Sequence, residues 1–158
     1  RMMSEPGTLL QSGWAIQSNL VDENIPCPPY NVSIHPTREY RNTKLAFGII
    51  DRMQQLMPNT YRWSLVTQPP GGKVAKHVDQ GDEYTAHIPL YWDKDAVFVC
   101  GENEDTILTF PPTGEIYILD TTVPHYTENR STVDRIGVIF RFNHSELPNL
   151  LKLSGTIQ

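Results

Sequence analysis

Two side chains that could bind a metal ion stand close together in the stretch KHVDQGD, residues 76–82. His77 and Asp79 are two positions apart, and residues i and i+2 of a β-strand point to the same face of a sheet. If the stretch is extended, an imidazole and a carboxylate converge from one strand and need only one more ligand. Pairs of this kind are common by chance, so the alternative interpretation is a solvated strand end.

A third ligand of suitable type follows 48 residues after His77. His125, in TTVPHYTEN, lies near the end of a late strand. Two histidines and one carboxylate form the facial set that holds Fe(II) in non-haem oxygenases and leaves coordination positions open. Those positions accept O₂ together with a bidentate 2-oxo acid. His77, Asp79 and His125 are therefore the predicted metal ligands and catalytic residues.

Arg135 opens the apolar stretch RIGVIFRF, ten residues after His125. A guanidinium buried among apolar residues needs a partner, because an unpaired buried charge is costly. It matches a carboxylate with two parallel hydrogen bonds, as the far end of a 2-oxo diacid would offer. The alternative is a structural arginine at a strand start, exposed or paired with Asp134 or Glu128. In combination with the three predicted ligands, the cosubstrate role is favoured.

The elements that must position these residues are mainly strands. From Tyr61 onward, short stretches rich in β-branched and aromatic residues alternate with turn residues. These stretches are YRWSLVT, KVAKHVD, YTAHIPLYW, AVFVC, TILTF, EIYILD and RIGVIFRF. So many short strands in roughly 80 residues are typical of a sandwich or barrel, and we predict a mainly β, cupin-like jelly roll.

A chain of 158 residues suits a single domain, 1–158. We divide it into residues 1–60, with irregular strands and a covering helix, and 61–145, the jelly-roll core with the metal site. The helix is predicted over 43–59, where apolar residues recur at helical spacing. Thr43 is its predicted cap, Pro58 and Asn59 end it, and its apolar stripe would cover one outer face of a sheet.

Composition excludes some partners. The net charge is −5 and no Lys/Arg cluster exists to neutralise phosphates, which argues against nucleic acid. No apolar run reaches the roughly 18 residues of a membrane span, and the first ten residues do not resemble a leader. Cys27 and Cys100 stand far apart, so we interpret them as reduced thiols of a cytoplasmic protein, with one disulfide as the alternative.

The runs PPGGKVAKHVD, HIPL and PTGEIYILDTTVPHYTENRSTVDR together resemble the aspartyl/asparaginyl β-hydroxylase group of Fe(II)/2-oxoglutarate dioxygenases. Bacterial proline cis-hydroxylases are similar in the same pattern. The resemblance extends over residues 70–142 and keeps the order and spacing of the motifs, while the first 60 residues show none. It implies a double-stranded β-helix with one or two covering helices and iron near its open end.

The resemblance also implies roles for single residues. His77, Asp79 and His125 would bind iron, and Arg135 would bind the distal carboxylate of 2-oxoglutarate. The family usually has an arginine two residues before the histidine of H-x-PL, where this chain has Thr85. Thr85 and His87 are accordingly the further predicted cosubstrate contacts, with a shifted cosubstrate as the alternative.

Two interior positions keep competing interpretations. His87 faces the barrel interior if Ile88 packs outward under the helix, and a core histidine is the alternative. Arg141 shares a strand face with Arg135. It could clamp a substrate carboxylate, but a solvent-facing strand end is favoured.

The predicted function is Fe(II)/2-oxoglutarate-dependent hydroxylation, with O₂, of an amino acid or of a side chain in a peptide or protein. Succinate and CO₂ would be the co-products. The alternatives are a cupin-like metal-dependent isomerase or hydrolase, and a non-catalytic jelly-roll binding module. The short chain suggests either an open groove for a peptide or a homodimer that completes the pocket.

Overall fold

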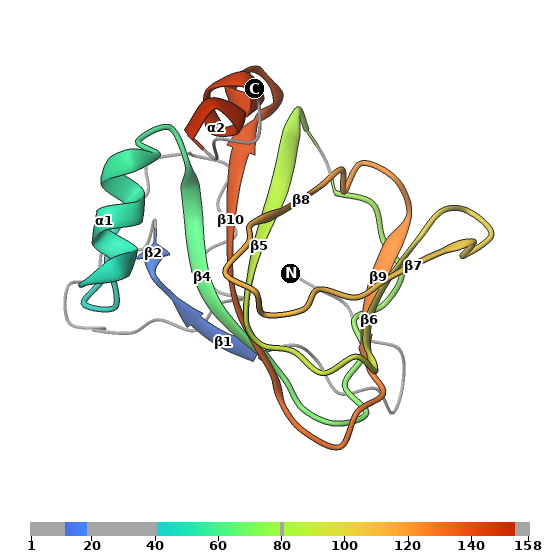
Figure 1. The fold of residues 1–158 in the computed structure, drawn as a ribbon. Coiled ribbons are helices and arrows are strands. Elements are labelled where there is room, and N and C mark those ends of the chain that lie inside the picture. Colours follow the sequence, from blue (N-terminus) through green and yellow to red (C-terminus); the bar gives the residue numbers. More distant parts are fainter. Residues whose placement is uncertain (1–11, 19–40, 80, 154–158) are drawn as a thin grey trace.

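Two antiparallel β-sheets face each other in this protein, and two helices lie beside the larger sheet (Figure 1). The computed structural model describes residues 12–18, 41–79 and 81–153. The strands are β1 Ser12–Ala15, β2 Gln17–Ser18, β3 Arg41–Asn42, β4 Tyr61–Gln68, β5 Glu83–Tyr91, β6 Ala96–Cys100, β7 Thr106–Leu108, β8 Tyr117–Leu119, β9 His125–Asn129 and β10 Arg135–Asn143. The helices are α1 Ile49–Leu56, the 3₁₀ turn η2 His144–Glu146 and α2 Leu147–Leu153.

The strand order is that of a jelly roll. The large sheet runs β1-β4-β10-β5-β8 and the small one β7-β6-β9, with β2 and β3 forming a separate pair. Along the chain, β4 of the large sheet is followed by a segment bridged to β9 at the edge of the small sheet. The chain then returns to the large sheet as β5, and it continues to alternate until β10 closes between β4 and β5. The predicted mainly β, double-stranded β-helix with covering helices is thereby confirmed.

The main apolar cluster lies on the outer face of the large sheet, under the helices. Trp63 of β4 stacks on Phe140 of β10 with ring centroids 4.2 Å apart. Leu150 of α2 and Met57, just after α1, cover this face. The buried members of the cluster are Ile16, Met57, Trp63, Ala86, Ile88, Val138, Phe140, Phe142 and Leu150.

The predicted helix is shorter than expected. It begins at Ile49 rather than in the stretch after Thr43, and Gly48 precedes it with a positive φ of 57°. The Thr43 hydroxyl donates instead to the carbonyl oxygens of Ala15 and Ile16, at 2.9 and 3.1 Å. The same hydroxyl accepts the backbone N–H of Leu45 at 3.3 Å, so Thr43 begins a turn and not the helix. α2 is the second covering helix, and its position, Leu147–Leu153, was not predicted.

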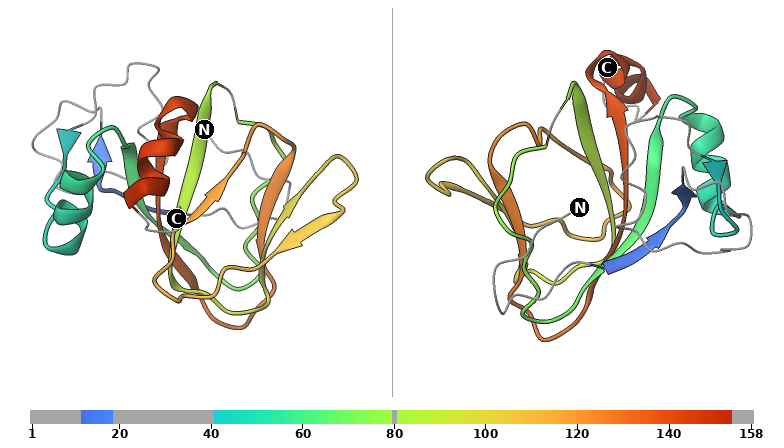
Figure 2. Two further views of the ribbon diagram at one scale, coloured as in Figure 1. Left: turned by 45° about the horizontal axis from the view of Figure 1, so that its top comes forward. Right: turned by 180° about the vertical axis from the view of Figure 1, so that it is seen from behind.

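The predicted strand over residues 73–79 is also reduced. Only Lys73 and His77 form bridges, to Glu128 and His125 of β9, and the residues between them are irregular. β9 is missing from the strand stretches predicted above, and His125, expected near the end of a late strand, is the first residue of β9. In the views of Figure 2 the β6–β7 hairpin projects away from the helices.

Of the two cysteines, Cys100 lies among the described residues. Cys27 lies outside the described residues, so its predicted state stays a prediction, whereas Cys100 is a free thiol. Among the described residues, no helix is both long enough and apolar enough to cross a membrane.

Candidate metal centre

The faces of the two sheets that look toward each other carry polar side chains. On β10, Arg135 and Arg141 lie on the side opposite to Val138 and Phe140 of the outer cluster, as strand alternation requires. On β5, Ile88 packs in the outer cluster, so His87 faces the interior, as predicted for that arrangement. The buried polar side chains of the strands are Ser64, Gln68, Thr85, His87, His125, Thr127, Asn129 and Arg135.

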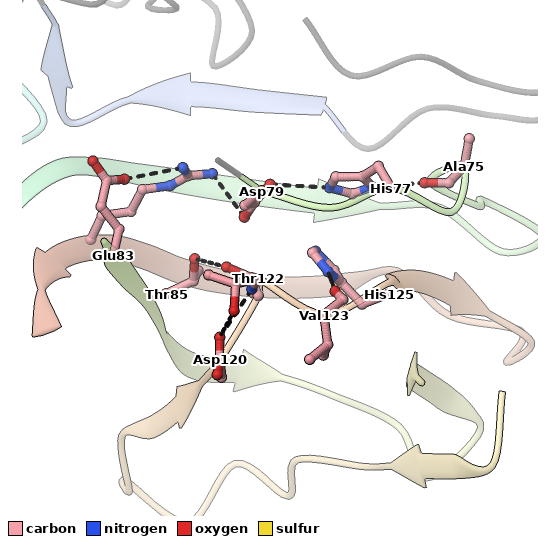
Figure 3. A network of polar contacts seen from close by, with 11 residues as sticks. Ala75, His77, Asp79, Glu83, Thr85, Asp120, Thr122, Val123 and His125 are labelled. Atoms are coloured by element: carbon pink, nitrogen blue, oxygen red, sulfur yellow. Dashed lines mark hydrogen bonds and ion pairs between the residues drawn. The ribbon is translucent and has the colours of Figure 1, made fainter. Parts of the chain in front are cut away.

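The three predicted ligands meet at one end of this interior (Figure 3). The nearest ligand atoms of His77, Asp79 and His125 all lie within 4.8 Å of one another. The Nε2 atom of His77 is 3.4 Å from Oδ1 of Asp79. Two ligand atoms bound about 2.1 Å from one ion at right angles are about 3 Å apart, so this spacing suits a shared ion. Within residues 12–18, 41–79 and 81–153 no second cluster of this kind occurs.

The main chain holds the two imidazoles together. His77 and His125 form a reciprocal bridge in which each backbone N–H donates to the other's carbonyl, at 3.0 and 2.9 Å. Their ring centroids are 4.4 Å apart. Two histidines that are 48 positions apart in the sequence therefore form a single cross-strand pair.

Each ring is also oriented by its own backbone. The Nδ1 atom of His77 lies 2.7 Å from the carbonyl oxygen of Ala75, and that of His125 lies 2.8 Å from the carbonyl oxygen of Val123. A carbonyl can only accept, so both Nδ1 atoms carry the proton. In the neutral rings the lone pair is then on Nε2, the atom that a metal would bind.

The charges around the centre favour an ionised carboxylate. Burial would raise the pKa of Asp79, but hydrogen bonds from His77 and Thr121 and the charge of Arg141 hold it well below its usual range. The hydrogen bond to Asp79 raises the pKa of His77, whereas burial lowers the pKa of His125. Asp79 is therefore a carboxylate and His125 a neutral imidazole near neutral pH, the forms in which both can bind a metal.

Arg135 lies deep in the interior, with 1% of its surface exposed. Its guanidinium sits 4.5 Å from the ring centroid of Trp92, which donates its indole N–H to the carbonyl of Ala96 at 2.7 Å. Gln68 is its cross-strand neighbour on β4. The exposed strand-start alternative for Arg135 is therefore wrong, while its predicted role toward a cosubstrate stays a prediction.

His87 is enclosed by aromatic rings. The centroids of Trp92, Phe98 and Phe110 lie 6.3, 6.2 and 5.9 Å from its own. Burial lowers the pKa of His87 to about 3, and the charge of Arg135 acts in the same direction. His87 is thus a neutral side chain buried in the interior, and its role as a cosubstrate contact stays a prediction.

Thr85 contacts a residue beside the centre. Its Oγ1 lies 3.2 Å from Oγ1 of Thr121, whose carbonyl accepts the backbone N–H of Asp79 at 2.9 Å. The predicted direct contact of Thr85 with a cosubstrate stays a prediction.

Arg141 corrects our favoured interpretation. Its side chain is only 14% exposed, and it forms ion pairs with Asp79 and Glu83. Solvent exposure is therefore wrong for this residue. Its shared strand face with Arg135 was the available signal, whereas nothing local in the sequence marks Thr121 or Glu83 as neighbours of the centre.

Two solved structures resemble parts of this chain. A predicted oxalate decarboxylase from Thermotoga maritima is 18% identical, and the match covers 57% of this chain and 72% of that chain with a TM-score of 0.42. A cupin 2 conserved barrel domain protein from Salinispora arenicola is 15% identical, with 60% and 71% covered and a TM-score of 0.42.

No curated protein matches the chain. The family model described as aspartyl/asparaginyl β-hydroxylase matches residues 33–145, well over half of the sequence. This range contains the three clustered ligands and both interior arginines. The chain therefore belongs to the aspartyl/asparaginyl β-hydroxylase family.

Proposed function

We propose that this protein is an Fe(II)/2-oxoglutarate-dependent dioxygenase that hydroxylates an unactivated C–H bond of an amino acid or of a peptidyl side chain. The observation that carries the proposal is the convergence of His77, Asp79 and His125 in a chain of this hydroxylase family. Two imidazoles and one carboxylate are the donor set of non-haem Fe(II) oxygenases. Nothing in the fold itself requires these three side chains to meet.

The interior also fits a keto diacid. Arg135 is a buried cation on the face of β10 that looks into the barrel, and it is suited to bind the distal carboxylate of 2-oxoglutarate. Ser64 Oγ and Gln68 Oε1 are buried and make no hydrogen bond to the described residues. Polar atoms in such a position are normally satisfied by water or by a ligand, so this space is suited to a polar occupant.

The roles of the side chains follow from this arrangement. His77 and His125 would hold the iron through Nε2, and Asp79 through a carboxylate oxygen. With O₂ and 2-oxoglutarate, the bound iron would supply the oxidant that turns C–H into C–OH, giving succinate and CO₂. The rings of Phe98 and Phe110 around His87 would exclude water from this space.

Succinate formation tests the proposal. The protein is incubated under air with Fe(II), 2-oxoglutarate and a panel of amino acids and peptides, beside the His77→Ala variant. We expect succinate from the parent protein and none from the variant. Failure of every substrate to give coupled or uncoupled succinate would count against the proposal.

Calorimetry separates the rival functions. A dioxygenase binds 2-oxoglutarate only in the presence of a metal such as Mn(II), because the keto acid chelates the ion. A metal-dependent isomerase or hydrolase would bind the metal but would show no metal-dependent binding of 2-oxoglutarate. A non-catalytic binding module would keep its function after His77→Ala.

A further inference from the structure

One guanidinium lies between two carboxylates at the edge of the candidate metal centre. The Nη2 atom of Arg141 is 3.3 Å from Oδ2 of Asp79, and its Nη1 atom is 3.4 Å from Oε2 of Glu83. The three side chains are only 14%, 17% and 13% exposed, so solvent screens these contacts less than it screens surface pairs. Arg141 thus contacts a predicted ligand directly.

The two oxygens of Asp79 have different surroundings. Oδ1 faces His77, at 3.4 Å from its Nε2, and Oδ2 faces Arg141. A carboxylate can bind an ion through one oxygen or through both. While Arg141 holds Oδ2, Oδ1 is the oxygen that faces His77, so Asp79 would bind an ion through Oδ1 alone.

The fold supports this contact from both sides. Arg141 is the cross-strand partner of Thr85, so its side chain enters the interior beside β5. The carbonyl of Thr121 accepts the backbone N–H of Asp79 at 2.9 Å and holds the main chain of this residue in place. Glu83, two residues before Thr85 on the same strand face, anchors the second nitrogen of the guanidinium.

We propose that Arg141 is a positioning residue that holds Oδ2 of Asp79, so that Asp79 offers the ion one oxygen in a fixed direction, with Glu83 keeping the guanidinium in place. The inference rests on the proposed function in one respect, namely that His77, Asp79 and His125 bind an ion. It does not depend on the cosubstrate or on the reaction.

Two effects of Arg141 on metal affinity oppose each other, and this makes the proposal easy to test. A guanidinium close to a divalent ion repels it, so a pure charge effect predicts tighter metal binding when the arginine is removed. Positioning predicts weaker binding, because Asp79 is then free to rotate away from the two histidines. The direction of the change decides between them.

The experiment titrates Co(II) into the full chain and follows the visible absorption of the bound ion, which reports its coordination. Arg141→Met should bind Co(II) about 10–100-fold more weakly, the usual effect of losing an outer hydrogen-bond partner of a ligand. Arg141→Lys keeps one charged donor and should recover part of the affinity. Glu83→Gln should show a smaller loss in the same direction, since it loosens Arg141 without removing it.

Arg130→Met is the matched control. Arg130 also pairs with a carboxylate, Glu128 at 2.8 Å, but on the exposed surface, so its loss should leave Co(II) affinity and spectrum unchanged. Circular dichroism melting of the metal-free proteins shows that each variant is folded. If Arg141→Met does not fold, Arg141→Lys and Glu83→Gln carry the test.

The outcomes separate this inference from the proposed function. Unchanged or tighter Co(II) binding with an unchanged spectrum in the Arg141 variants would overturn the positioning role and leave the function standing. Weaker Co(II) binding in the Arg141 variants, together with a parent protein that never produces succinate, would support the positioning role and count against the dioxygenase. A parent protein that binds no Co(II) would overturn both.

Discussion

The two faces of the large sheet differ although the same strands supply both. On the outer face, Trp63, Val138 and Phe140 pack under the helices as an apolar cluster. On the inner face, the same strands β4 and β10 present buried polar groups such as Gln68 and Arg135. In this barrel the inside carries the candidate site, and much of the hydrophobic stabilisation comes from outside it.

Substitutions at neighbouring positions of one strand should therefore have different effects on stability and on ligand binding. Outer-face substitutions should lower the free energy of unfolding and leave the centre intact in the molecules that remain folded. Inner-face substitutions should remove ligand binding and change stability less, because polar groups around a ligand space contribute little apolar burial.

The largest effect is expected on metal affinity, when a predicted ligand is removed. His77→Ala should reduce metal affinity by far more than the 10–100-fold typical of an outer partner, since it removes a ligand. The half-exposed ring contributes little packing, so unfolding of the metal-free protein should change by about 1 kcal/mol or less. Lys76→Ala, at an exposed position next to it, is the control. Equal metal affinity in parent and variant would refute the centre.

On the outer face, Phe140→Ala should destabilise the protein by about 3–5 kcal/mol, the usual result of emptying a buried aromatic site. Phe140 is fully buried and stacks on Trp63. Urea unfolding measures the loss, and Co(II) titration of the folded protein should match the parent within about twofold. If Phe140→Ala is largely unfolded, Phe140→Leu gives the same comparison at smaller cost. A selective loss of metal binding would contradict the separation of the two faces.

Arg135→Gln should weaken metal-dependent 2-oxoglutarate binding by at least about 2 kcal/mol, or roughly 30-fold, as expected for removal of a buried charged partner. Affinity for Co(II) alone should not change, because Arg135 lies over Trp92 and not among the ligands. Calorimetry with and without the keto acid measures both. Unaltered keto acid affinity would remove Arg135 from the cosubstrate site.

The smallest effect concerns pH. His87 has a pKa of about 3 in the folded protein against about 6.5 unfolded, because burial lowers it. The charges of Arg135, His125 and Arg141 lower it further, and that of Asp79 raises it. Between these values the unfolded chain binds more protons, so stability is complete above pH 6.5 and falls as the pH drops toward 3. The slope from this group is at most about 1.4 kcal/mol per pH unit.

Urea unfolding of the metal-free protein between pH 4.5 and 7, compared with His87→Gln, isolates this contribution. The variant should lose less stability on acidification. Parallel curves for the two proteins would show that His87 titrates normally and is not enclosed.

The features that could be predicted depend on local patterns. Alternation along RIGVIFRF placed Arg135 and Arg141 on one strand face, and the two-residue spacing of His77 and Asp79 put both on one side of their segment. The number of short strands with turn residues between them indicated the jelly roll. Each of these follows from the period-2 geometry of extended chain.

The features that could not be predicted depend on contacts between distant segments. The Thr43 hydroxyl donates to the carbonyls of Ala15 and Ile16, far away in the sequence, and the helix begins only at Ile49. The interior place of Arg141 follows from its pairing with Asp79 and Glu83, and neither lies near it in the sequence. Residues 73–79 lack a full ladder because only two of them bridge β9. Such outcomes are set by tertiary structure, which overrides local propensity.

Because a backbone bridge joins His77 and His125, binding of an ion during refolding would report when the barrel closes. Pairings between residues so distant in the chain are slow to form, since a long loop must first be ordered. A half-folded chain with free strand edges cannot bring the two imidazoles within reach of one atom. Growth of the cobalt spectrum during refolding should therefore time the moment at which the last strands join, separately from the earlier gain of secondary structure.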